Sequence, residues 1–147
     1  MSILNLQGSY FSIDSPLRIL DRWLNRFHHH ERAVINQRDM DIYWTERANT
    51  ALMARTEPLV IELQLYFSCV VQKRVLFHQQ ATFETFAVNN RLELAFHPVE
   101  SAVCDPTEFA SMHPVGKDLS QGVAARMVPK RVEIDFRQDE WEGSFSY

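Results

Sequence analysis

Apolar and polar residues alternate with a period of two over residues 59–67. The apolar positions are Leu59, Ile61, Leu63, Leu65 and Phe67. Such alternation is typical of a β-strand with one buried face. It predicts that Glu62, Gln64 and Tyr66 lie on the opposite face, away from the core. The apolar pattern runs on beyond the length of one ordinary strand, so we expect a bulge or turn near 72–74.

A second pair of strands is predicted around Asn89-Asn90. Asparagine tolerates positive φ, and this dipeptide is suited to a two-residue hairpin turn that pairs Val88 with Arg91. The two strands are 83–88 and 91–97. That register places on one buried face Phe83, Ala87, Leu92, Leu94 and Phe96.

Two helices are predicted before these strands. The first begins at Pro16, which suits the first helical position, and extends to about His28 or His29. Its apolar residues recur at helical spacing and are Leu17, Leu20, Trp23, Leu24 and Phe27. The second is expected over 40–56, and Pro58 follows its end because the residue before a proline disfavours the helical conformation.

The order of these elements predicts one α+β domain over 1–147. Two N-terminal helices are expected to pack on a curved antiparallel sheet of about four to six strands. The last predicted strand is 131–137, with Val132, Ile134 and Phe136 inside. A long irregular connection spans 98–130, and an acidic, aromatic tail occupies 138–147.

Composition restricts the classes of partner and compartment. The 147 residues are 46% hydrophobic and carry a formal net charge of −4, which favours a packed core and gives no general attraction for nucleic acid. Two cysteines do not make a disulfide framework. No apolar run is long enough to cross a bilayer, so we expect no membrane association and a cytoplasmic location.

Glycine placement excludes several common enzyme classes. No glycine occurs between Gly8 and Gly116, so the dinucleotide-binding fingerprint and the phosphate-binding P-loop are both absent. A G-x-S-x-G elbow, an H-E-x-x-H helix and paired C-x-x-C motifs are also lacking. We therefore expect no cofactor and no metal, and we favour a protein without enzymatic activity.

A row of basic residues on the first helix is a candidate anion site. Arg18, Arg22 and Arg26 are spaced by four residues, and His29 joins them if the helix extends that far. Guanidinium groups suit a phosphate, a carboxylate or an acidic partner surface. The alternative is an ordinary solvated helix face. The neighbouring histidines at 28–30 are interpreted as a polar helix end, because adjacent helical residues point about 100° apart and cannot share one ion.

Polar residues on the predicted strands form a second candidate site. If the connection 98–130 folds over the sheet, a ligand-binding cleft can be lined by Glu62, Tyr66, Glu93, His97 and Cys104. If nothing covers that face, these residues are ordinary cross-strand polar pairs. Cys69 shares the parity of the apolar positions and is expected to be buried.

Three aromatic residues in the tail are a candidate interface. Trp141, Phe145 and Tyr147 either dock on another chain or cover the protein's own sheet. Our leading hypothesis is a non-enzymatic protein-binding or assembly module that binds a protein partner or itself, including as a homodimer. The alternatives are a small-ligand enzyme or receptor with a cleft under 98–130, and an anion- or nucleic-acid-binding protein that uses the arginine row.

Overall fold

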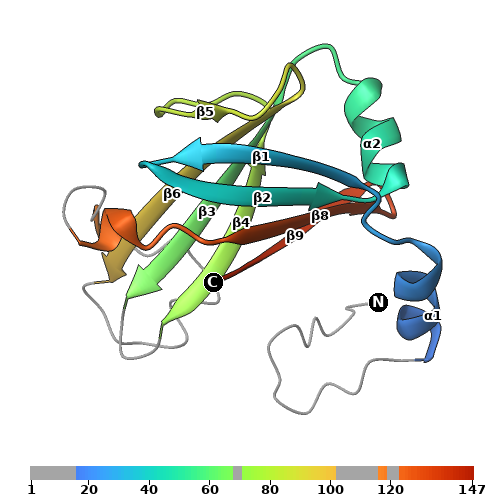
Figure 1. Cartoon of the computed structure of the whole chain (residues 1–147), viewed down its shortest axis with the longest axis horizontal. Coiled ribbons are helices and arrows are strands. Elements are labelled where there is room, and N and C mark those ends of the chain that lie inside the picture. Colours follow the sequence, from blue (N-terminus) through green and yellow to red (C-terminus); the bar gives the residue numbers. More distant parts are fainter. Residues whose placement is uncertain (1–15, 68–70, 102–115, 119–122) are drawn as a thin grey trace, which may run out of the picture.

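The computed structural model describes residues 16–67, 71–101, 116–118 and 123–147. In these ranges two α-helices, one short 3₁₀ helix and nine strands build two mixed β-sheets that stack face to face (Figure 1). The helices are α1 (Pro16–Leu24), α2 (Glu46–Met53) and the 3₁₀ helix η1 (Ala124–Arg126). The α+β class is therefore confirmed, whereas the single antiparallel sheet is wrong.

Sheet A has the strand order β1-β2-β8-β9. Its strands are β1 (His29–Ile35), β2 (Arg38–Trp44), β8 (Arg131–Arg137) and β9 (Glu140–Ser146). β2 and β8 are parallel, and the other two pairs are antiparallel hairpins. Both hairpin turns have two central residues with positive φ, namely Asn36, Gln37, Gln138 and Asp139.

Sheet B has the order β4-β3-β6-β5, with β7 also paired to β6. Its strands are β3 (Leu59–Phe67), β4 (Gln72–His78), β5 (Phe86–Ala87), β6 (Leu92–Ser101) and β7 (Gly116–Asp118). β3 lies between parallel β6 and antiparallel β4. The end of β6, β7 and η1 all fall within 98–130, so the described part of that connection contains regular structure.

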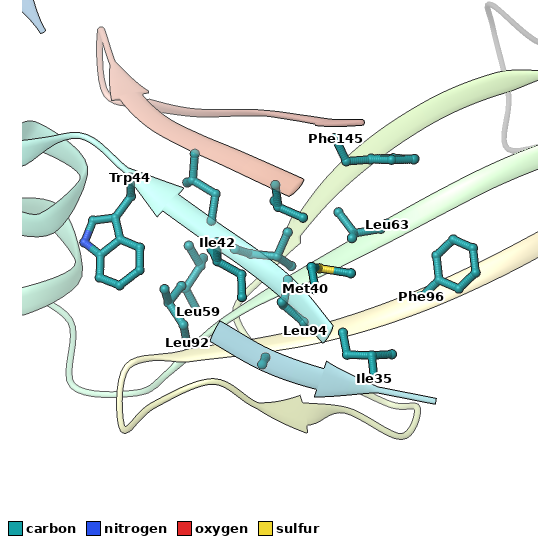
Figure 2. Close-up of a cluster of buried hydrophobic side chains, with 14 of the residues drawn as sticks. Ile35, Met40, Ile42, Trp44, Leu59, Leu63, Leu92, Leu94, Phe96 and Phe145 are labelled. Atoms are coloured by element: carbon teal, nitrogen blue, oxygen red, sulfur yellow. The ribbon is translucent and has the colours of Figure 1, made fainter. Parts of the chain in front are cut away.

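The core fills the space between the two sheets (Figure 2). Met40 and Ile42 of β2 face Leu63 of β3 and Leu94 of β6, and all four are fully buried. At one side of the sandwich β9 meets β4: a Cβ on Gly143 would lie 2.8 Å from Cγ1 of Val75. Glycine therefore allows the two sheets to approach closely there.

The predicted second helix is wrong over its first part. Residues 40–44 form strand β2, in which Met40, Ile42 and Trp44 are buried. Residues i and i+4 share a face in a strand as well as in a helix, so the spacing of Met40 and Trp44 fitted both. The helix starts only after Thr45, whose hydroxyl accepts a hydrogen bond from the Ala48 amide (3.2 Å) and caps it.

The first helix is described over Pro16–Leu24 and ends earlier than predicted. The Asn25 side chain donates to the Asp21 carbonyl (3.0 Å), and β1 begins at His29. No residue of α1 is buried, so its apolar side does not pack on the sheet. The second helix also follows a β-hairpin, which corrects the predicted order of two helices before the strands.

The strand over 59–67 is confirmed, as is the strand over 131–137. The break expected near 72–74 comes slightly earlier, because β3 ends at Phe67 and β4 begins at Gln72. The hairpin register is wrong by one residue: Phe86 pairs with Leu94, and the Val88 amide donates to the Leu92 carbonyl. The turn takes an extra residue because the Asn89 side chain accepts from the amides of Arg91 and Leu92.

Because of this one-residue shift in register, the side chains of 83–88 lie on the opposite faces of the sheet from those predicted. Phe86 and Val88 pack against the core, while Ala87 is exposed and Phe83 lies on the other side of sheet B. Cys69 lies outside the described residues.

Candidate functional site

The face of sheet B that points away from the core carries a buried polar cluster. Glu62, Gln64 and Tyr66 of β3 are 7%, 9% and 2% exposed. The strand register sets Gln64 between Arg74 of β4 and His97 of β6. These three residues were predicted to lie away from the core, and on β3 that second face is buried as well.

The Glu62 carboxylate is the centre of the cluster. Its Oε1 accepts hydrogen bonds from Gln64 Nε2 (2.6 Å) and His97 Nδ1 (3.1 Å), and its Oε2 accepts one from His78 Nε2 (2.7 Å). Burial alone would raise the pKa of Glu62, but these three donors outweigh it and lower the pKa to about 2. Glu62 is thus ionised at neutral pH, and each imidazole carries its proton on the nitrogen that faces it.

Other side chains frame the two histidines. The Phe83 ring meets both imidazoles edge-on, at centroid distances of 5.6 Å from His78 and 4.8 Å from His97. The Arg74 guanidinium lies 5.8 Å from the centroid of the Tyr66 ring, and burial raises the pKa of Tyr66. The cluster can hold a proton donor or acceptor in a fixed orientation, which is the arrangement that acid–base groups use.

One acceptor in this cluster has no partner. The Gln64 amide must point its nitrogen at the ionised Glu62, so its Oε1 faces the other way. Within the parts of the chain that the structure describes, Gln64 Oε1 is buried without a hydrogen bond. Buried acceptors are normally satisfied, so this atom calls for a donor.

The structure brings together part of the predicted cleft. Glu62 and His97 are in contact, and Tyr66 lies on the same face. Glu93 instead accepts a hydrogen bond from the Thr85 hydroxyl (2.8 Å), and Cys104 lies outside the described residues. Sequence reasoning missed Gln64, His78 and Phe83, because only the β3–β4 register shows that His78 reaches Glu62. No cluster of three or more His, Cys, Asp or Glu residues in the described ranges could hold a metal ion.

Helix α1 presents a different kind of surface. Its apolar residues cover an arc of about 160°, at about 100° per residue, and point outward. We call this set the α1 apolar surface: Leu17, Ile19, Leu20, Trp23 and Leu24, which are 77%, 59%, 51%, 64% and 64% exposed. Figure 1 shows α1 at the periphery, beside the stacked sheets. An amphipathic helix usually turns its apolar side to the core, and α1 does the reverse.

The polar side of α1 is tied to sheet A by Arg47 of α2. The Arg47 guanidinium donates two hydrogen bonds to Asp21 (3.0 and 2.9 Å) and two to Asp135 of β8 (2.7 and 2.6 Å). These bonds lower the pKa of Asp21, and they outweigh burial to lower the pKa of Asp135. Thr45 also donates to Asp135 (2.6 Å). Paired bidentate contacts of this kind fix the orientation of the helix.

A cavity of about 730 Å³ lies between α1 and sheet A. Its charged lining residues are Arg18, Arg22, Arg137, Asp21, Glu133, Asp135, Glu140 and Glu142. Arg18 and Arg22 therefore share the cavity with five carboxylates. Anion binding by the arginine row stays a prediction, and these carboxylates weigh against it.

The remaining members of the predicted anion site lie apart from the cavity lining. Arg26 follows the helix and is exposed. His29 lies on β1, where its Nε2 is 2.6 Å from a carboxylate oxygen of Glu46 and its ring stacks on Trp44. The interpretation of this histidine as part of a helix end is wrong, because the helix stops before it.

The C-terminal aromatic residues belong to strand β9. Phe145 is 6% exposed and lies in the core of its own chain, so it offers no surface to a partner. Trp141 stacks on Phe77 of β4 with a centroid distance of 6.0 Å. Tyr147 is half exposed, with the Lys73 ammonium 5.3 Å from its ring centroid. Own-chain packing thus accounts for the first two, and an interface role for Tyr147 stays a prediction.

Comparison with known proteins gives no family model, no curated protein and no solved structure that matches the chain. None of the helices in the described ranges is long and apolar enough to cross a membrane.

Proposed function

We propose that this protein is a protein-binding or assembly module and that the α1 apolar surface is its contact element. One observation carries the proposal: α1 exposes five large apolar side chains while its polar side is tied to its own sheet. Their exposed area is on the order of 500 Å², at the size where patches on monomers are often functional.

The attachment of α1 supports a binding role. Arg47 joins Asp21 and Asp135, so the apolar side is held facing outward. A surface held in its binding orientation loses less conformational freedom when a partner docks. Leucine and tryptophan at the spacing i, i+3 and i+7 on a helix are the usual anchors that bind in an apolar groove or against another helix.

A lipid surface is a poorer match for the same helix. Interfacial helices present basic side chains to anionic headgroups, but Arg18 and Arg22 line the cavity on the sheet side together with carboxylates. The net charge of −4 also opposes binding to anionic lipid. We therefore favour a protein partner.

Site-specific photo-cross-linking tests the proposal. A photoreactive phenylalanine analogue in place of Trp23 is expected to give discrete cross-linked products in cells, and Leu20→Glu in the same chain should abolish them. The matched control carries the analogue in place of Val34, which is 59% exposed on β1, and should give none of these products. The absence of discrete products from position 23 would contradict the proposal.

A second candidate function is suggested by Gln64. Its partnerless buried Oε1, next to two imidazoles oriented by Glu62, suits a small ligand that offers a hydrogen-bond donor. A fragment screen read from the side-chain amide signals of Gln64 tests this idea. We expect amide- or ammonium-bearing fragments to shift these signals, and the His97 imidazole signals should shift with them in the wild type but not in a Gln64→Leu variant; no shift from any fragment would count against a ligand site.

A further inference from the structure

The α1 apolar surface has the spacing that pairs one helix with another. Leu17, Leu20 and Leu24 are at i, i+3 and i+7, the repeat that lines the seam between two helices. A ridge of this kind packs best against a similar ridge, and a second copy of the chain supplies an identical one.

We infer that α1 pairs with α1 of a second copy about a two-fold axis. This inference rests on the proposed function, because it names the partner of the same surface. Closed two-fold dimers are the commonest assemblies of soluble chains, and in them the same patch contacts itself. An exposed apolar ridge at the periphery of the fold meets that requirement.

The area sets the strength of this dimer. Two copies of the surface bury on the order of 1,000 Å² together, the lower limit for a specific interface and well below the ~1,600 Å² of a standard one. The dimer is therefore weak and reversible, with a dissociation constant in the micromolar range.

The charges around the surface set its salt dependence. Asp21 is held by Arg47, and Arg18 and Arg22 line the cavity, so the exposed Arg26, two residues after the helix, is the next charged residue along the chain. In a two-fold antiparallel pair, each flank of one helix faces the same flank of its partner. With Leu20 near the axis, however, the two copies of Arg26 lie at opposite ends of the interface, roughly 18 Å apart at 1.5 Å per residue, so their repulsion is largely screened and the dimer should depend little on salt. Binding to anionic lipid would weaken with salt instead.

Sedimentation equilibrium of the full chain tests the inference. Over about 1 to 500 µM, chosen to bracket a micromolar constant, we expect the mass to rise from monomer to dimer. Leu20→Glu should remain a monomer throughout this range. Val34→Glu, the same change at a comparably exposed position on β1, should dimerise like the wild type.

Charge complementation separates a lost contact from a damaged fold. Leu20→Glu and Leu20→Lys should each be monomeric alone, and an equimolar mixture should regain dimer, because position 20 lies near the two-fold axis. A misfolded variant would not recover on mixing. A mixture that stays monomeric, with each variant monomeric alone, would overturn the paired geometry.

The remaining outcomes are also decisive. If the wild type is monomeric throughout but still cross-links from position 23 to another protein, the inference fails and the proposed function stands. A dimer that survives Leu20→Glu uses another surface and overturns the inference. Flotation with phosphatidylcholine–phosphatidylglycerol vesicles, lost in Leu20→Glu and accompanied by no dimer, would overturn both.

Discussion

Strand β3 and helix α1 both reverse the usual distribution of polar and apolar side chains. β3 buries a carboxylate, Glu62, while α1 exposes leucines and a tryptophan. The difference lies in what surrounds them. Glu62 receives three hydrogen bonds from its own chain, whereas the α1 apolar surface buries none of its side chains.

This contrast separates folding from association. A buried charge is tolerated only when its own chain supplies donors, so the Glu62 cluster is bound up with the stability of sheet B. An exposed apolar arc adds little to the stability of the monomer. Covering it lowers the free energy, which is why we propose a binding role for α1.

The largest expected effect compares two leucines. Leu94 is fully buried between the sheets, and Leu20 is 51% exposed on α1. Leu94→Ala should lower the free energy of unfolding by about 4 kcal/mol, because it removes buried methyl groups and leaves a cavity. Leu20→Ala should change it by less than about 0.5 kcal/mol, and urea denaturation at a concentration where the chain is monomeric measures both.

A large loss of stability in Leu20→Ala would contradict the expected difference between the two leucines. It would mean that the apolar side of α1 packs within its own chain. Unchanged stability together with weaker dimerisation would show that Leu94 stabilises the fold, whereas Leu20 contributes to association.

Removing the buried carboxylate is the next largest effect. Glu62→Ala leaves the donors of Gln64, His78 and His97 without their acceptor, so we expect a loss of about 3 kcal/mol. The control is Glu93→Ala on the same face, which removes one hydrogen bond from a half-buried side chain. Equal losses in the two variants would show that the cluster around Glu62 contributes no more to the free energy of unfolding than a single hydrogen bond at the same face.

The main strands could be predicted because alternation depends only on local burial. Two hairpins were missed because their turns lack the usual glycine: Asn36-Gln37 and Gln138-Asp139 reach positive φ without it. The turn at Asn89 was predicted one residue too short, because the hydrogen bonds of an asparagine side chain cannot be read from alternation.

The candidate sites divide in the same way. Parity along the predicted strands placed Glu62 and His97 on one side of the sheet, and the structure brings them into contact. His78 depends on a pairing between β3 and β4 that no local pattern encodes. The apolar side of α1 was visible in the sequence, but its outward direction depends on Arg47, which joins residues far apart in the chain.

The Glu62 cluster should also give stability a characteristic pH dependence. Its pKa is lowered from 4.5 to about 2 in the folded protein, so its contribution is fully present above pH 4.5 and is lost as the pH falls toward 2. Linkage predicts a loss of about 2 kcal/mol between pH 6 and pH 3. Urea denaturation of the wild type and of Glu62→Gln at each pH measures this contribution, because only the wild type has the carboxylate. Parallel pH profiles for the two proteins would contradict the lowered pKa.

The smallest effect on stability should come from releasing α1. Asp21→Asn weakens the bidentate contact with Arg47, and since both side chains are a quarter or more exposed we expect a loss of only about 0.5–1 kcal/mol. Amide hydrogen exchange should nevertheless rise in α1 and not in β3, and the dimer should weaken because the helix is no longer held in its binding orientation. Arg32 and Asp41, an exposed ion pair within sheet A, provide the control: Asp41→Asn should leave both exchange in α1 and dimerisation unchanged. Slow exchange in α1 despite Asp21→Asn would show that something other than Arg47 holds this helix against its sheet.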